Sequence, residues 1–129
     1  MNTRHKIIDC AQALSLAAEL RGRGSAVKVV SGYFDVLVPD HVRRLRQIAD
    51  RSHKLFVFVL DLPSPLLATR ARAELVAALA MVDYVVPVAE QGVEQLLGSF
   101  GASEIIREES ADLRRSERLS QHVKRRHQP

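Results

Sequence analysis

The residues best suited to chemistry lie where a strand pattern runs through a glycine turn into a helix. The β-branched segment 27–31 is followed by Gly32. The next helix opens at Pro39, with Asp40 and His41 in its first turn. In α/β proteins this layout brings a phosphate group against main-chain amides at a helix N-terminus, and an imidazole there can donate one further hydrogen bond. The segment therefore predicts a phosphate site at the end of the first central strand.

Helical and strand patterns alternate along the chain, which is typical of parallel strands joined by crossover helices. The strand patterns cover residues 27–31, 55–60, 84–88 and 103–106. The helical patterns cover residues 11–21, 66–80, 91–100 and 113–126, besides the helix that opens at Pro39. We predict one α/β domain over residues 1–129, with a small doubly wound parallel sheet of Rossmann-like type. Its ligand crevice should lie at the carboxyl ends of the strands.

The composition is ordinary for a globular chain, with 129 residues of which 47% are hydrophobic and 26% charged. The single cysteine, Cys10, excludes an internal disulfide and indicates a reducing compartment. It lies on an apolar helix pattern, so we expect a buried small side chain. The N-terminal residues are polar and the apolar positions after them are periodic, which excludes a secretory signal or a membrane span. We predict a cytoplasmic protein with no membrane partner.

The net charge of +4 indicates anionic partners without identifying them. Much of the excess lies in residues 124–127, K-R-R-H. Nucleic-acid binding favours a basic face interleaved with aromatic residues, and aromatics make up only 5% of the chain. We therefore interpret residues 123–129 as a frayed basic tail and do not expect a nucleic acid as partner. A nucleic-acid accessory role through this tail is the weakest alternative.

Several segments resemble the cytidylyltransferase-like nucleotidyltransferases. Residues 32–41, G-Y-F-D-V-L-V-P-D-H, are similar to the family pattern G-x-F-D-x-L-H-x-G-H. Arg72 and residues 75–87 resemble the arginine-bearing helix and following strand of the heptose-phosphate and glycerol-phosphate subgroups. Residues 115–122, R-S-E-R-L-S-Q-H, resemble the family motif R-T-x-G-I-S-[ST]-[ST]. The segment 109–115 is short, so we expect a strand that the family often has there to be absent.

The resemblance implies a HUP-type nucleotidyltransferase fold and transfer of CMP or AMP from a nucleoside triphosphate to a small phosphorylated substrate, releasing pyrophosphate. It implies a homodimer and no permanently bound cofactor, with Mg²⁺ arriving on ATP or CTP. His41 is implied as the catalytic residue. Nucleotide or phosphate binding is implied for Gly32, Tyr33, Phe34, Asp35, Arg72, Arg115 and Ser120. No His, Cys, Asp or Glu cluster has metal-ligand spacing, so we predict no metal ligands.

Several positions depart from the family pattern, and three of them bear directly on the chemistry. Val38 stands where the family has a histidine, and loss of one such pre-aimed donor typically slows a reaction about 10²–10³-fold. Asp40 replaces a glycine, and we expect it to cap the helix amides and repel a phosphate. Arg118 also replaces a glycine, and it could either attract phosphate or fill its space. We predict weak or lost activity, with an inactive pseudoenzyme, used for nucleotide sensing or protein interaction, as the alternative.

Each implied side chain also has a structural interpretation. An ordinary exposed histidine is the alternative for His41, and a helix-surface arginine is the alternative for Arg72. Asp35 can bond turn amides. Arg115 and Ser120 can serve helix solvation and capping.

Overall fold

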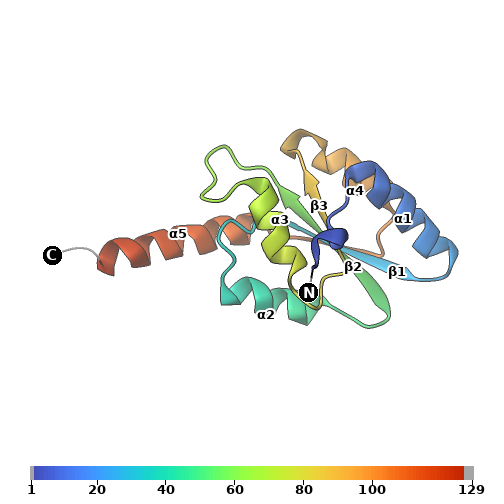
Figure 1. Ribbon diagram of the computed structural model, residues 1–129, viewed down its shortest axis with the longest axis horizontal. Coiled ribbons are helices and arrows are strands. Elements are labelled where there is room, and N and C mark those ends of the chain that lie inside the picture. The colour runs from blue at the N-terminus through green and yellow to red at the C-terminus, as the bar shows by residue number, and fades with distance from the viewer. Residues whose placement is uncertain (1, 127–129) are drawn as a thin grey trace.

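A four-stranded parallel sheet forms the centre of the computed structural model, which describes residues 2–126 (Figure 1). Its strands are β1 (Ala26–Gly32), β2 (His53–Leu60), β3 (Tyr84–Val88) and β4 (Glu104–Arg107), in the spatial order β3-β2-β1-β4. Every neighbouring pair is parallel, with Val30 of β1 opposite Val57 of β2 and Ile106 of β4. The predicted α/β Rossmann-like fold is confirmed, and it is consistent with a HUP-type nucleotidyltransferase domain.

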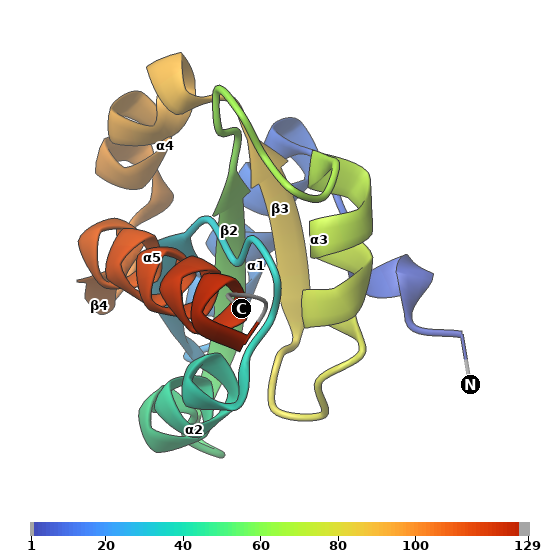
Figure 2. The same cartoon turned by 90° about the vertical axis from the view of Figure 1, so that its left-hand side faces the viewer.

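Helices cover both faces of this sheet. They are α1 (Cys10–Gly22), α2 (Pro39–Ile48), α3 (Thr69–Ala77), α4 (Val93–Phe100) and α5 (Glu109–Arg126). Short 3₁₀ turns lie at η1 (Arg4–Lys6) and η2 (Glu90–Gly92). α1 and α4 pack on one face of the sheet and α2 and α3 on the other (Figure 2). α5 instead starts at the carboxyl end of β4 and projects away from the body of the molecule (Figure 1).

Two apolar layers hold the helices against the sheet, and β2 contributes to both. Phe56 and Phe58 face α1 and α4, where the ring of Phe100 meets them edge-on at centroid distances of 5.0 and 5.2 Å. Val57, between them, faces α2 and α3. Because successive side chains of a strand point to opposite faces, the continuous apolar run 55–60 reflects a strand that is covered on both sides.

Two helix starts differ from the predicted ones by three or four residues. α3 begins at Thr69 instead of residue 66, because the carboxylate of Asp35 accepts hydrogen bonds from the amides of Leu66 and Leu67. α5 begins at Glu109 instead of residue 113. One residue joins it to β4, so no strand stands between them, as the short segment predicted.

Cys10, the first residue of α1, is only half-buried, so the expectation of a buried side chain is wrong. It lines a hollow of about 310 Å³ together with Leu14 and Leu96. Burial raises the pKa of its thiol, which keeps the thiol protonated near neutral pH.

The ends of the described chain bear on two further predictions. Within residues 2–126, every helix is too short or too polar to cross a membrane. Residues 123–126 of the predicted basic tail form the last turn of α5, and residues 127–129 lie outside the described part. Fraying of this tail stays a prediction.

The packing around Phe100 can be tested by truncation. Phe100→Ala removes the ring that both phenylalanines of β2 contact, and we expect the free energy of unfolding to fall by about 3–5 kcal/mol. Leu66→Ala, at a side chain 72% exposed, is the control and should change it by less than about 0.5 kcal/mol. Urea unfolding followed by circular dichroism measures both. Equal effects would contradict the assignment of Phe100 to the core.

Candidate functional site

The loop between β1 and α2 turns two consecutive amides toward one point at the carboxyl end of β1. Phe34 and Val36 have positive φ angles of 51° and 61°, which residues other than glycine adopt uncommonly. The β-branched side chain of Val36 makes this conformation rarer still. In this loop the amides of Tyr33 and Phe34 both donate to Oδ2 of Asp112, at 2.8 and 3.3 Å. Backbone strain of this kind persists where the surroundings hold it, and it often marks a binding site.

Asp112, in the first turns of α5, occupies that point. Its side chain is 1% exposed. Besides the two amides, its Oδ1 accepts a 2.6 Å hydrogen bond from Nη1 of Arg115 and lies 2.8 Å from Nε2 of His41. Four groups of positive polarity from the β1–α2 loop, α2 and α5 therefore surround one carboxylate. We call these four groups the oxyanion seat.

Gly32 allows the close approach that the seat requires. A Cβ added at Gly32 would overlap Oδ2 of Asp112 and the ring of Phe34. The family motif's glycine thus has a steric role in this chain, because any side chain would push the carboxylate out of the seat.

His41 lies at the predicted phosphate site, and it is not the exposed histidine of the alternative interpretation, because it is 2% exposed. Its Nδ1 accepts a 3.0 Å hydrogen bond from the amide of Val38, so the neutral ring carries its proton on Nε2. That nitrogen points into the seat. Although Oδ1 of Asp112 is 2.8 Å away, the approach is poorly directed, and Nε2 has no hydrogen-bond partner among the described residues.

Arg115 joins the seat to α2. Besides binding Asp112, it donates from Nε to Oδ2 of Asp40 at 3.1 Å, and its Nη2 lies 3.7 Å from Glu108. Burial alone would lower the pKa of Arg115, but hydrogen bonds to Asp40 and Asp112 raise it above its usual value.

Asp40 does not cap α2 as predicted. The helix begins at Pro39, so Asp40 lies inside its first turn with the carboxylate directed to Arg115 and Arg43.

Asp35 turns away from the seat. Both of its carboxylate oxygens accept amide hydrogen bonds from the β2–α3 loop, at 2.8 Å from Leu66 and 3.0 Å from Leu67. This is the turn-bonding role that the structural alternative described, and it fixes the loop that precedes α3.

Arg72 is wholly enclosed, so a helix-surface arginine is the wrong interpretation. Its Nη1 donates to the carbonyls of Tyr33 at 2.8 Å and Leu60 at 2.7 Å. Its Nε donates to Leu67 and its Nη2 to the hydroxyl of Thr69, at 3.0 and 2.9 Å. The guanidinium therefore ties the ends of β1 and β2 to the start of α3, just behind the seat.

A hollow of about 370 Å³ lies between the start of α2 and the face of α5 beside the seat. It is lined by Val38, Asp40, Arg43, Arg115, Arg118 and Leu119. Arg118 lines this hollow together with Arg115. Ser120 is exposed on α5, and within residues 2–126 it has no hydrogen bond to the seat.

Asp112 is the site residue that sequence reasoning missed. Its signal was its place three residues before Arg115, which puts both side chains on one face of a helix. The short connection after β4 was the second signal, because it brings that helix directly over the end of β1. Within residues 2–126, no group of three or more His, Cys, Asp or Glu side chains is arranged to hold a metal ion.

Comparison with known proteins supports the family resemblance. No family model matches the chain. The bifunctional protein HldE of Coxiella burnetii is 30% identical over 104 residues, which cover 74% of this chain and 22% of that protein. HldE proteins of Alkalilimnicola ehrlichii and Hydrogenovibrio crunogenus are 31% and 34% identical over 97 and 92 residues. These relatives support a cytidylyltransferase-like family. They also support a nucleotidyltransferase-like domain, and the chain spans about a fifth of their length.

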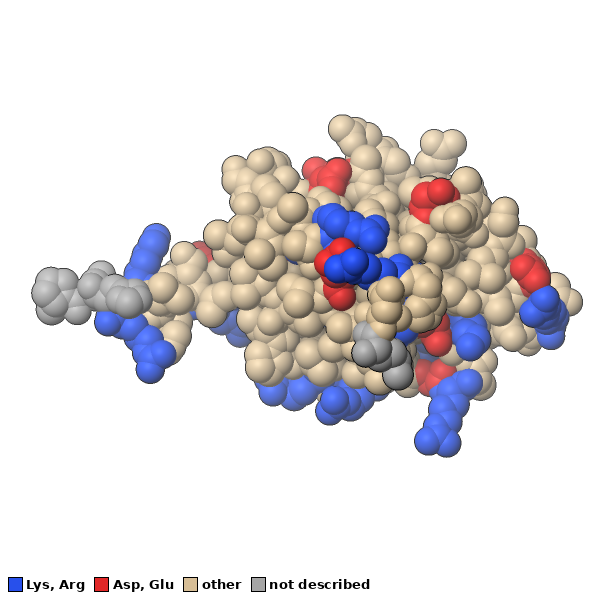
Figure 3. Space-filling model, in the orientation of Figure 1, with Lys and Arg blue, Asp and Glu red and all other residues tan. Residues whose placement is uncertain are grey.

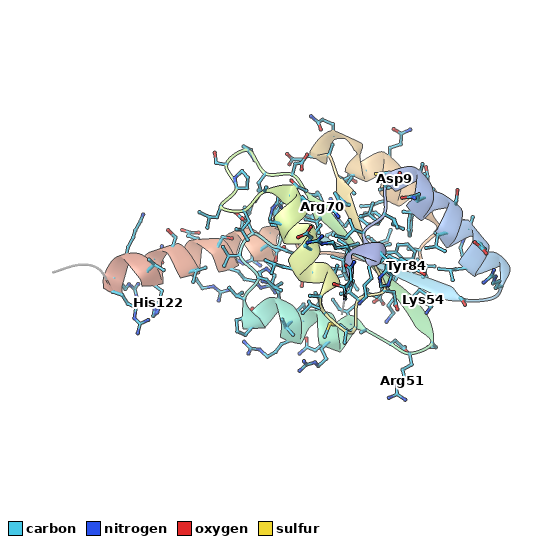
Figure 4. All side chains as sticks on the ribbon, viewed as in Figure 1. Asp9, Arg51, Lys54, Arg70, Tyr84 and His122 are labelled. Atoms are coloured by element: carbon cyan, nitrogen blue, oxygen red, sulfur yellow. The ribbon has the colours of Figure 1, made fainter. Side chains whose placement is uncertain are left out.

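The role of Arg72 can be tested by removing its charge at similar volume. Arg72→Met leaves the carbonyls of Tyr33, Leu60 and Leu67 without their donor. Because a buried unsatisfied acceptor costs about 1–3 kcal/mol, we expect the free energy of unfolding to fall by about 3 kcal/mol or more. Arg70→Met is the matched control on the outer side of the same helix (Figure 4). If Arg72→Met and Arg70→Met lowered the free energy of urea unfolding equally, the hydrogen bonds of the Arg72 guanidinium would not stabilise the loops.

The ion pairs of Asp40 predict an acid response. Hydrogen bonds from Arg115 and Arg43 lower its pKa, so its contribution to stability is present above the ordinary aspartate pKa of about 3.9 and is lost as pH falls through the folded-state value. We expect melting temperature to fall more between about pH 5 and about pH 2 in the wild type than in Asp40→Asn. Glu117→Gln, which removes an exposed carboxylate of α5, should follow the wild type. Identical profiles for the wild type and Asp40→Asn would refute this contribution.

Proposed function

We propose that this chain is a cytidylyltransferase-like nucleotidyltransferase domain with weak or no turnover in its present sequence. The family reaction would transfer CMP or AMP from a nucleoside triphosphate to a small phosphorylated substrate. The observation that carries the proposal is the oxyanion seat. Its two amides, imidazole proton and guanidinium converge at the carboxyl end of β1, where the strand order reverses and doubly wound folds bind their ligands.

The donors of the seat suit this reaction. A phosphate oxygen of the acceptor attacks the α-phosphorus, the bond to the bridging oxygen breaks, and pyrophosphate leaves with that bond's electron pair. Negative charge spreads over the equatorial oxygens, so positioned N–H donors are the main contribution a protein can make. Mg²⁺ would arrive with ATP or CTP and neutralise charge on the phosphates.

Three features in and beside the seat argue against efficient turnover. Val38 presents no donor where the family places an imidazole, and Asp40 places a carboxylate in the hollow beside Arg115. In addition, the donors already surround a carboxylate of the chain itself. These features favour the second candidate function, an inactive module for nucleotide sensing or protein interaction. A homodimer and a cytoplasmic location stay predictions from the family and the composition.

Restoring the motif tests the proposal. We expect Val38→His with Asp40→Gly to bind Mg²⁺-ATP or Mg²⁺-CTP at least tenfold more tightly than the wild type in calorimetric titration. Pyrophosphate release with phosphorylated acceptors should rise by about 10²–10³-fold over any wild-type rate, because one aimed donor is regained and one carboxylate removed.

The same double change with His41→Ala is the control, and it should lose the gain. Failure of the restored variant to bind either nucleotide at millimolar concentration would overturn the nucleotidyltransferase proposal. Micromolar binding by the wild type without pyrophosphate release would favour the nucleotide-sensing module.

A further inference from the structure

The oxyanion seat holds a carboxylate in a setting built for a larger anion. We propose that the seat is a binding site for a phosphate or pyrophosphate group, which the chain fills with Asp112, so that the Asp112 carboxylate and the free anion compete for it. The inference rests on the proposed function, because it concerns the position assigned there to a phosphate. It goes further in making Asp112 an internal inhibitor of that site.

The contacts of Asp112 are those that a phosphate would make. Both its oxygens are engaged: Oδ2 by the amides of Tyr33 and Phe34, and Oδ1 by Arg115. Consecutive amides and a guanidinium are also the donors that proteins present to phosphate oxygens. A buried carboxylate with such partners is a chemical substitute for two of the oxygens of a phosphate.

His41 shows that the substitution is incomplete. Its Nε2 is buried and lies 2.8 Å from Oδ1 of Asp112, yet this contact lacks hydrogen-bond geometry, so the imidazole proton has no aligned acceptor among the described residues. A carboxylate offers two oxygens in one plane, whereas a phosphate offers oxygens at tetrahedral directions. A tetrahedral anion could therefore engage the imidazole proton as well as the donors that Asp112 already uses.

The hollow beside the seat gives an anion a way in. Arg115 borders both the hollow and the seat, and Arg43 and Arg118 line the hollow's walls. Three guanidiniums and one carboxylate line this opening, and Asp40 pairs with Arg115 and Arg43, which leaves a net positive lining. This charge favours the approach of an anion toward Asp112.

The attachment of α5 makes displacement of Asp112 feasible. Its start is held by Glu109, which accepts from the hydroxyl of Ser31, and by the preceding Glu108, which accepts from Arg44 at 2.9 Å. Within residues 2–126, no hydrogen bond or ion pair joins residues 117–126 to the body of the molecule. Figure 4 shows His122 on this projecting part, and Figure 3 shows basic side chains gathered at its end, which holds Lys124, Arg125 and Arg126. An incoming anion would have to break only the contacts of the first two turns.

The test removes the competing charge and keeps the shape. Asp112→Asn still offers an oxygen to the two amides but no negative charge. We expect inorganic pyrophosphate to bind this variant at least about tenfold more tightly than the wild type in calorimetric titration, within the usual range of coupling between competing sites. Glu117→Gln makes the same charge change on α5 outside the seat, and its affinity should equal that of the wild type.

Three results would overturn the proposal. They are equal affinities of Asp112→Asn and the wild type, equal gains in Asp112→Asn and Glu117→Gln, and loss of the fold in both Asp112→Asn and Asp112→Ser. The last would make the carboxylate a structural requirement instead of a displaceable occupant. Because the probe is pyrophosphate without a nucleoside, tight binding to Asp112→Asn would stand even if the restored motif binds no nucleotide and the proposed function fails.

Discussion

The backbone of Tyr33 is held between two buried charges, and the geometry of the site depends on this arrangement. Its N–H donates to the carboxylate of Asp112, while its carbonyl accepts from the guanidinium of Arg72. The two charges lie on different helices, α5 and α3, and both are buried. Through this one residue the end of β1 is fixed relative to both helices.

The strained backbone of that loop follows from the same constraint. Positive φ angles at Phe34 and Val36 each cost of the order of 1–3 kcal/mol and persist only where the surroundings hold them. Asp112 holds the amide side of Phe34, and Ser116 donates to the carbonyl of Asp35 at 3.4 Å. α5 therefore does more than cover the sheet end, because it maintains the conformation that points two amides at one oxyanion.

The sequence was sufficient for those features that depend on neighbours along the chain. The apolar run 55–60 and the glycine turn after residue 31 located two strands and the candidate site, because period and turn chemistry are local properties. The enclosure of Arg72 could not be read in this way, since its guanidinium reaches a carbonyl at Tyr33, 39 residues earlier. The role of Asp112 could not be predicted for the same reason. Its amide partners lie 79 and 78 residues before it, and only the folded sheet brings them together.

An oxyanion site that loses its ligand does not become neutral. Each buried donor left without a partner costs about 1–3 kcal/mol, so a fold that keeps the strained loop needs a hydrogen-bond acceptor in the seat. In the phosphate site that we propose, Val38 and Asp40 weaken binding of the phosphate, and Asp112 supplies a negative charge from within the chain. The residues that disfavour a phosphate and the carboxylate that occupies its place are therefore physically linked. Because Asp112 supplies an acceptor from α5, the loop between β1 and α2 keeps its shape whether or not a nucleotide binds.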